Sequence, residues 1–220
     1  MTTAEARQIQ IELTKVVSRA NFVNDPKVIA GADVSVDRIK HEGKAAVVVL
    51  SYPQFEIIEK QTAYGEVNFP YIPGLLSFRE MPLTLSAFEK LQYTPDLVLV
   101  DGAGIAHPRR MGLASHLGLF LDIPTVGCAK SLLTGEWMEL GLERGSLSDI
   151  TDTGEVIGAA VRTRAGVKPM YISIGHMVDL PTALIWTLKC CRGFRIPEPT
   201  RLAHIASRAN RKKSGIVLKS

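Results

Sequence analysis

Three consecutive stretches decide the architecture of this chain: KVIAGADVSV at residues 27–36, KAAVVVLSY at 44–52 and FEIIEKQTAY at 55–64. Each stretch is short, rich in β-branched residues and bounded by glycine, proline or polar residues, which is typical of strands. The connection Tyr52-Pro53-Gln54 is short enough for a hairpin. We therefore predict that the sheet begins with an antiparallel meander of three strands.

The remaining elements follow from hydrophobic periodicity on both sides of this meander. A helix is predicted before it, because Ile9, Leu13, Val16 and Ala20 recur at helical spacing. The elements expected after it are a helix at 75–92 that Pro82 kinks or restarts, a strand within 95–104, a helix at 111–121, a strand at 124–128, an irregular region, strands at 155–163 and 168–175, and helices at 181–194 and 197–212. This order favours an α/β fold in which the meander leads into parallel crossovers flanked by helices, and it is compatible with a ribonuclease H-like mixed sheet.

Composition indicates one folded domain spanning residues 1–220, with 46% hydrophobic and 22% charged residues. The longest aliphatic run, residues 45–50, is far shorter than a membrane-spanning helix, and an acid stands where a signal peptide has bases. Three cysteines, Cys128, Cys190 and Cys191, form neither an even disulfide framework nor a CxxC metal spacing. These features predict a cytoplasmic protein without a membrane partner.

The net charge of +4 is concentrated at the C-terminal end. Residues 201–220 contain six bases and no acid, so the other 200 residues hold 20 bases against 22 acids. A basic tail from about 207 to 220 is therefore expected. It is either a solvated terminus or an arm that contacts phosphates, and charge alone does not decide between the two.

A rigid loop is predicted at residues 65–74, GEVNFPYIPG. Pro70 and Pro73 flank Tyr71 and Ile72, and proline fixes φ and cannot donate a ladder hydrogen bond. The pattern therefore indicates an aromatic side chain held on a stiff segment.

Three acids are candidates for chemistry, and each has a structural alternative. Asp33 lies inside an apolar strand, where it either faces a cation or points outward with Ser35. Asp101 follows the buried run LVLV at the strand edge where ligand sites concentrate, although an Asp before Gly also caps turns. Glu80 follows a helical stretch, where most glutamates are exposed. If the three converge, their oxygens suit Mg²⁺.

Several basic residues are candidates for contacts with phosphate. His107 and His116 flank PRRMGLAS, and an imidazole near carboxylates can assist proton transfer. Arg109 and its neighbour Arg110 could bind phosphate or lie in a solvated loop. Lys130 follows a short strand, and His204 is predicted on the last helix; each is also compatible with an ordinary surface role.

Six segments resemble the endonuclease V family, the deoxyinosine-directed repair nucleases with a ribonuclease H-like fold. The segments are IAGADVSV (29–36), PYIPGLLSFRE (70–80), DGAGIAHPRRMGLASHLGLF (101–120), PTVGCAKSLL (124–133), SIGHMVDLPTAL (173–184) and RIPEPTRLAH (195–204). The resemblance covers about residues 28–206. The chain departs from the family pattern at Ala103 and Ile174, which leaves every proposed ligand in place.

The resemblance assigns roles to individual residues. Asp33, Glu80 and Asp101 fall on metal-binding acids, His204 on a last-helix position that completes the site in some members, and Lys130 on a lysine near the scissile phosphate. Tyr71, in the segment Pro70-Tyr71-Ile72-Pro73, falls on the residue that acts as a strand-separating wedge in the family. Backbone groups around three further residues form the expected base pocket: Gly74, Leu76 and Gly102. Substrate contacts are further predicted for His107, Arg109 and His116.

The resemblance also implies an activity: cleavage of the second phosphodiester bond 3′ to deoxyinosine, leaving a 3′-hydroxyl and a 5′-phosphate. The implied cofactor is Mg²⁺, with Mn²⁺ as a substitute, and the implied partner is deoxyinosine-containing DNA acted on by a monomer. Two alternatives stay open: cleavage directed at inosine-containing RNA, and a noncatalytic module that binds inosine in nucleic acid.

Overall fold

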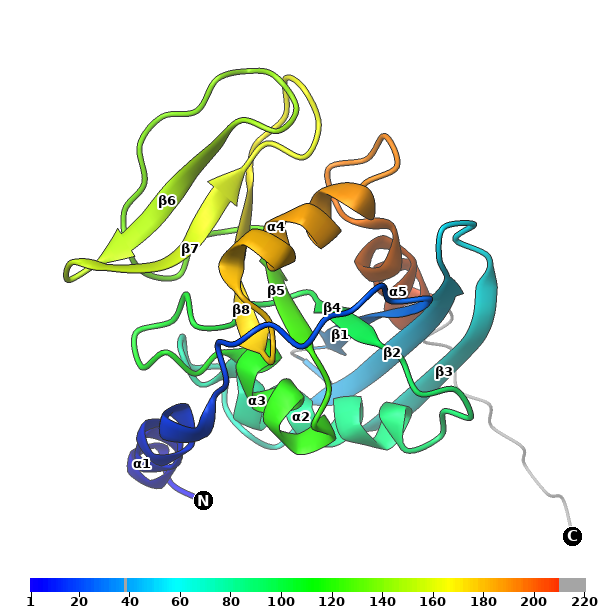
Figure 1. Ribbon diagram of the computed structural model, residues 1–220. Coiled ribbons are helices and arrows are strands. Elements are labelled where there is room, and N and C mark those ends of the chain that lie inside the picture. Colours follow the sequence, from blue (N-terminus) through cyan, green and yellow to red (C-terminus); the bar gives the residue numbers. More distant parts are fainter. Residues whose placement is uncertain (38, 210–220) are drawn as a thin grey trace, which may run out of the picture.

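The computed structural model describes residues 1–37 and 39–209, and its centre is one eight-stranded sheet in the order β3-β2-β1-β4-β5-β8-β7-β6 (Figure 1). The strands are β1 (Val28–Asp37), β2 (Glu42–Ser51), β3 (Ile57–Glu66), β4 (Leu97–Val100), β5 (Thr125–Ala129), β6 (Leu147–Asp152), β7 (Glu155–Val161) and β8 (Met170–His176). The helices are α1 (Thr3–Leu13), followed by a 3₁₀ turn (Thr14–Val16), α2 (Leu76–Phe88), α3 (Leu113–Leu121), α4 (Leu180–Lys189) and α5 (Glu198–Arg208).

The strand directions confirm the predicted mixed sheet. β1, β2 and β3 pair antiparallel as a meander, whereas β4 pairs parallel to both β1 and β5. From β5 onward, β8, β7 and β6 are again antiparallel. All four residues of β4 are buried, as expected for a central strand that is covered on both faces.

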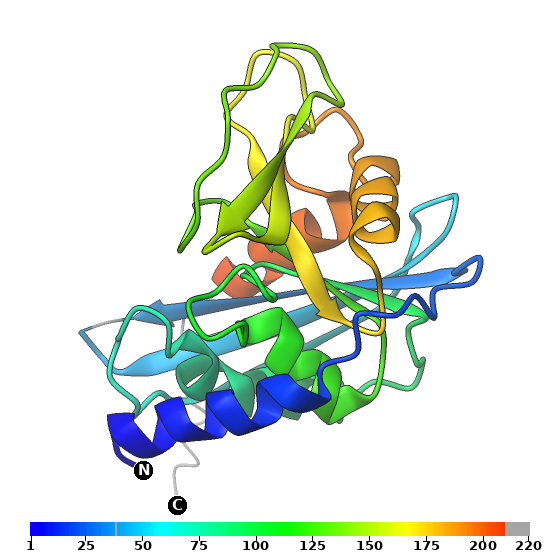
Figure 2. The same ribbon diagram turned by 60° about the vertical axis from the view of Figure 1, so that its left-hand side comes forward.

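Helices cover both faces of this sheet (Figures 1 and 2). On one face, α2 and α3 pack on alternate residues of β1, β2 and β4, among them Ala32, Val47 and Val98. On the other face, α4 packs near Ile29 and Leu99, and α5 packs on the β2 residues around Val48. No helix within residues 1–37 and 39–209 is long and apolar enough to cross a membrane.

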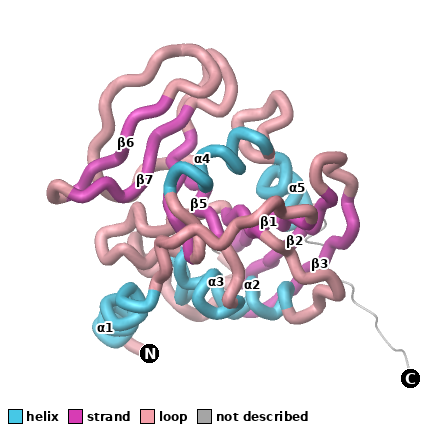
Figure 3. Tube along the Cα trace, viewed as in Figure 1, coloured by secondary structure: helices cyan, strands magenta, loops and turns pink. Residues whose placement is uncertain are grey.

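The strand β6 corrects the prediction that the region before residue 155 is irregular throughout. A long loop does follow β5 (Figure 3), but residues 147–152 then pair with β7. Only Ile150 of this edge strand is buried, so LSDITD carries little hydrophobic signal. Thr153 and Gly154 both have positive φ, which suits the tight turn that joins the two strands.

The helices also differ from their predicted extents. α1 ends at Leu13, so Ala20 lies outside it. The buried residues of α1 are Ala6 and Gln10 instead of Ile9, because the helix docks on loop carbonyls and not on the sheet. α2 is one helix from residue 76 to 88 with Pro82 inside it, because packing of its buried face outweighs the missing backbone donor.

The last two helices are shorter than predicted. α4 ends at Lys189, shortly before Gly193 with its positive φ. α5 ends at Arg208, so residues 207 and 208 of the predicted basic tail are helical. Residues 210–220 of that tail lie outside the described part of the chain.

Candidate active site

Two acids meet where β4 ends beside β1. The last parallel pair is Ala32 with Val100, and the Asp101 amide then donates to the Ala32 carbonyl over 3.0 Å. The chain turns away at Gly102, whereas β1 continues to Asp33 and beyond. The carboxyl edge of β4 therefore places Asp101 next to Asp33, as expected for a ligand site of an open α/β sheet.

Asp33 faces the last helix because of the strand pleat. Gly31 and Asp33 share one face of β1, and a side chain at Gly31 would come within 2.0 Å of the Pro199 backbone. Glycine therefore lets α5 approach the strand closely. Asp33 is only 7% exposed beneath this helix, so the outward orientation with Ser35 is wrong.

His204 and Ser207 complete the cluster from α5. His204 Nδ1 lies 3.4 Å from Asp33 Oδ2 and 3.9 Å from Asp101 Oδ2. Ser207 Oγ donates to Asp33 Oδ2 over 2.5 Å. Among the described residues, Asp33, Asp101 and His204 form a group whose ligand atoms all lie within 4.8 Å of one another.

Lys130 brings a positive charge to the same cluster. It follows β5, its ammonium donates to Asp101 Oδ2, and its Nζ lies 3.4 Å from His204 Nδ1. Arg195 Nη2 donates to the Lys130 carbonyl and to the Pro169 carbonyl, each over 2.7 Å. The backbone that carries the ammonium is thus anchored to two separate segments.

Glu80 approaches the acids from α2, on the opposite face of the sheet, and it is buried, not exposed. Burial, followed by the charges of Asp33 and Asp101, raises the pKa of Glu80 to about 8, while Arg79 acts in the opposite direction. Burial and the adjacent Asp33 likewise raise the pKa of Asp101, against the effect of Lys130. The site therefore disfavours the charged forms of both carboxyl groups, and Lys130 counteracts this effect at Asp101.

This donor set fits a divalent cation. Carboxylate oxygens are the ligands that Mg²⁺ and Mn²⁺ favour, and imidazole is compatible with Mn²⁺. Burial, and after it the neighbouring acids, raises the pKa values of Glu80 and Asp101, so a cation in the cluster would favour their charged forms. Asp33, Asp101 and His204 are the residues placed to hold such an ion, with Glu80 nearby.

A cavity of about 320 Å³ adjoins the acid cluster, and Asp101 and Lys130 belong to both. Seven residues predicted to contact substrate line it: Tyr71, Ile72, Pro73, Gly74, Leu76, Gly102 and His107. Its remaining wall includes Gln10, Met111 and Leu133. The predicted base-pocket residues are therefore brought together next to the candidate metal ligands.

One carbonyl oxygen in this wall is heavily hydrogen bonded. Gly74, whose φ is +79°, offers its oxygen to Gln10 Nε2 at 3.0 Å, His107 Nε2 at 2.9 Å and Arg109 Nη2 at 2.7 Å. His107 Nδ1 in turn accepts from the Arg109 amide, so the Nε2–H tautomer satisfies both contacts. Burial lowers the pKa of His107 to about 4, which keeps the ring neutral.

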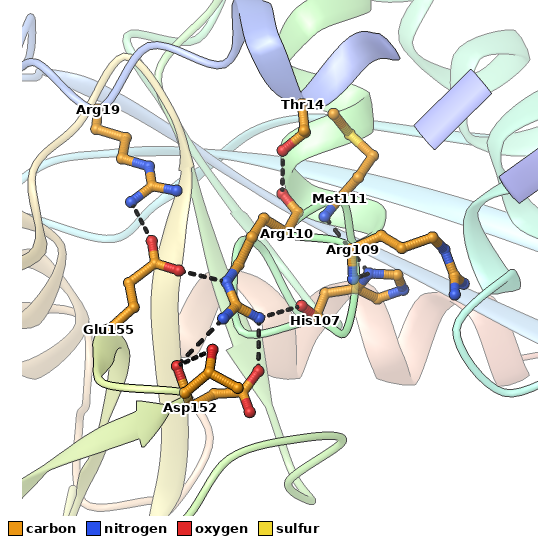
Figure 4. Close-up of polar contacts among 9 residues, drawn as sticks. Thr14, Arg19, His107, Arg109, Arg110, Met111, Asp152 and Glu155 are labelled. Atoms are coloured by element: carbon orange, nitrogen blue, oxygen red, sulfur yellow. Dashed lines mark hydrogen bonds and ion pairs between the residues drawn. The ribbon is translucent and has the colours of Figure 1, made fainter. Parts of the chain in front are cut away.

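Arg110 is used internally (Figure 4). Its guanidinium pairs with Asp152 and Glu155 over 2.7 Å each, and Glu155 also binds Arg19. Arg110 has a φ of 55°, and its carbonyl accepts from Thr14. The loop at 107–111 is therefore fastened to the β6–β7 hairpin on one side and to the N-terminal segment on the other.

Of the remaining predicted contact residues, Pro70 and His116 do not line the cavity, and Tyr71 lines it from an exposed position. Tyr71 is 55% exposed and Pro70 is also exposed on the same loop. His116 does not line the cavity; it is buried between the rings of Phe78 and Phe120, with centroids 5.2 and 5.3 Å away. Its contact with substrate stays a prediction.

Sequence reasoning missed Gln10, Arg195 and Ser207, which hold cavity walls or ligands in place. Each is an ordinary polar residue on a helix or loop, and its partner is distant in the chain. Arg195 stands inside the segment 195–204 that resembles the family, which is the only signal that could have found one of the three.

The comparison with known proteins agrees with this geometry. The sequence profile described as Endonuclease V matches residues 11–205. The chain belongs to the endonuclease V family. A curated endonuclease V from Dehalococcoides mccartyi is 52% identical over 207 residues, which cover 94% of this chain and 93% of the relative.

Solved endonuclease V structures share the fold. The Streptomyces avermitilis protein has a TM-score of 0.89 at 42% identity, covering 94% of this chain and 92% of that one. The Ciona intestinalis protein, crystallised with a 24mer DNA containing an inosine followed by a ribo-adenosine, has a TM-score of 0.81 at 31% identity, covering 93% of this chain and 95% of that one. As an endonuclease V family member, the chain is a hydrolase that acts on nucleic acid.

Proposed function

We propose that this protein is a DNA repair endonuclease that recognises deoxyinosine and hydrolyses the second phosphodiester bond on its 3′ side, leaving a 3′-hydroxyl and a 5′-phosphate. The observation that carries this proposal is that the cluster of Asp33, Asp101 and His204 adjoins a cavity of about 320 Å³, with Lys130 at their junction. Three unpaired cysteines are compatible with action in a reducing cytoplasm.

We infer that Mg²⁺, or Mn²⁺ in its place, is held by Asp33 and Asp101, with Glu80 and His204 assisting. Such an ion supplies charge that favours an attacking hydroxide and a leaving oxygen at a phosphodiester. Lys130 contributes a fixed ammonium beside the scissile phosphate, where it stabilises negative charge as the bond breaks. Ser207 orients the Asp33 carboxylate through its hydroxyl.

The cavity is proposed to receive the extruded hypoxanthine. Leu76 begins α2 and lines the cavity, so the first turn of this helix, where backbone amides lack partners within the helix, adjoins the proposed base site. Hypoxanthine carries an acceptor oxygen where adenine carries an amine, so amide donors favour it. Tyr71, on its proline-flanked loop, would occupy the space that the extruded base leaves.

The decisive experiment is strand-resolved nicking of a duplex with one deoxyinosine, with and without Mg²⁺, for the wild type and Asp101→Asn. We expect a Mg²⁺-dependent cut one nucleotide beyond the lesion, and no cut by the variant. A duplex with deoxyadenosine at the same position is the substrate control. Tight inosine binding without cutting would contradict the proposal and support the noncatalytic binding module.

A second candidate is cleavage directed at inosine in RNA. The DNA bound to the Ciona intestinalis protein has a ribo-adenosine after the inosine, so a ribonucleotide is accommodated next to the lesion in that relative. The same assay on matched DNA and RNA strands separates the two activities, because faster cutting of the RNA would assign the protein to the second.

A further inference from the structure

The helix α1 lies at the periphery, outside the layers formed by the sheet and its other helices (Figures 1 and 2). Within residues 1–37 and 39–209, no α1 residue belongs to a hydrophobic core cluster. Its buried residues are Ala6 and Gln10. A helix that offers a glutamine to the interior in place of an apolar stripe docks through specific polar contacts.

Gln10 has no exposed surface, and its amide group bridges two walls of the cavity. Its Nε2 donates to the Gly74 carbonyl over 3.0 Å and to the Met111 carbonyl over 2.9 Å. Its Oε1 accepts from Arg109 Nε over 2.6 Å. Both amide hydrogens and the oxygen are therefore used, and two carbonyls that are 37 positions apart in sequence are held by one nitrogen.

The contact with Arg109 has a further consequence for Gly74. While Nε of the guanidinium binds Gln10, its Nη2 reaches the Gly74 oxygen. Gln10 thus acts on this oxygen directly and also by orienting a second donor. With His107 as the third donor, the oxygen has no capacity left for a hydrogen atom of a bound base.

The wall that contains Met111 is itself immobilised. Arg110 is fixed by Asp152 and Glu155, and its carbonyl accepts from Thr14, which directly follows α1 (Figure 4). The loop that carries Tyr71 and Gly74 therefore takes its position from this neighbour. His107 and Arg109 reach the Gly74 carbonyl from the neighbouring loop itself, and Gln10 binds both walls from α1.

We propose that Gln10 is a positioning residue that sets the base selectivity of the cavity: it holds the Gly74 and Met111 walls together and keeps the Gly74 oxygen occupied, so that an adenine amine finds no acceptor there. This inference rests on the proposed function, because it concerns the same cavity. Among the described hydrogen bonds, Gln10 contacts Gly74, Met111 and Arg109 and none of the candidate metal ligands.

The test compares Gln10→Met with Gln8→Met. Methionine matches glutamine in length and removes all three contacts. Gln8 lies on the exposed side of the same helix and binds only Glu12 in the described contacts, which makes it a matched control. Binding of duplexes with deoxyinosine or deoxyadenosine at one position is measured by fluorescence anisotropy in EDTA. We expect the preference for inosine to fall about tenfold in Gln10→Met and to stay unchanged in Gln8→Met.

Two further measurements separate positioning from general damage. Amide hydrogen exchange of residues 70–76 should accelerate in Gln10→Met while that of β4 stays protected. Gln10→Glu keeps the acceptor for Arg109 but loses both donors, so it should lose the preference as well. An equal loss of affinity for both duplexes, or an unchanged preference, would overturn the role of Gln10. A wild type without inosine preference would instead overturn the proposed function, while the exchange data would still report on the two walls.

Discussion

The hydroxyl of Ser207 donates a 2.5 Å hydrogen bond to Oδ2 of Asp33, although the two residues lie 174 positions apart in the chain. Ser207 is fully buried on α5, three residues after His204. This bond joins the last helix to the first strand at the candidate metal ligand. The orientation of Asp33 therefore depends on how α5 docks.

Ser207→Ala should raise the Mg²⁺ concentration needed for half-maximal nicking by about tenfold, because removing a partner of a metal ligand weakens metal binding. The measurement is a Mg²⁺ titration of nicking together with the melting temperature. Ser115→Ala is the matched control, since Ser115 is equally buried and its hydroxyl has no hydrogen-bond partner among residues 1–37 and 39–209. Similar titration curves for both variants would contradict the role of Ser207.

Gly31→Ala should destabilise the protein by about 3 kcal/mol, because the added methyl group would collide with the backbone at Pro199 and force α5 from the strand. Urea unfolding measures the loss. Gly166→Ala serves for comparison: in the described part of the chain nothing lies within 4 Å of the added Cβ, and only the left-handed backbone is strained, at about 1 kcal/mol. Equal losses would show that the close approach of α5 is not the cause.

Tyr71→Ala should slow nicking of a duplex containing deoxyinosine about tenfold or more, because stacking on an aromatic ring contributes about 1–3 kcal/mol per base. A single strand with the same lesion should be affected less, since no partner strand has to be separated. The Mg²⁺ dependence should not change. Tyr93→Ala is the control, because Tyr93 is similarly exposed, at 52% against 55%, and lines a different groove. Undiminished duplex nicking by Tyr71→Ala would exclude the wedge.

The buried His116 should make the protein sensitive to acid. Burial lowers its pKa from 6.5 to about 4, so the folded state binds this proton less readily than the unfolded state. The stability associated with the neutral ring is complete above pH 6.5 and is lost as the pH falls towards 4. Between pH 7 and pH 5 the loss amounts to about 2 kcal/mol.

His116→Phe should keep the aromatic contacts with Phe78 and Phe120 and remove this part of the acid sensitivity. Urea unfolding at pH 7 and pH 5 tests this expectation. His41→Asn, at an exposed histidine with positive φ, should follow the wild type. If the wild type and His116→Phe lose the same stability on acidification, the protonation of His116 is not responsible.

The antiparallel meander of β1, β2 and β3 and the parallel strands that follow it could be predicted from local sequence, whereas the antiparallel pairing of β8, β7 and β6 could not. The stretches at 27–36, 44–52 and 55–64 are rich in β-branched residues and are bounded by glycine, proline or polar residues, as strands are. The short connections between them favour antiparallel pairing of consecutive strands. β6 could not be predicted, because an edge strand with one buried residue has almost no periodic signal. Hydrophobic periodicity places Ile9 on the buried face of α1, because the method assumes that a helix buries its apolar residues.

The sequence by itself determined the mixed sheet, the family and the identity of the candidate acids, because strand periodicity and long motifs are local properties of the chain. Only the tertiary structure decided that Asp33 faces α5, that Glu80 is buried, and that Gln10 and Ser207 support the site. These contacts join segments that are far apart in sequence. Their existence depends on how closely helices approach the sheet, as at Gly31, and no local pattern specifies that distance.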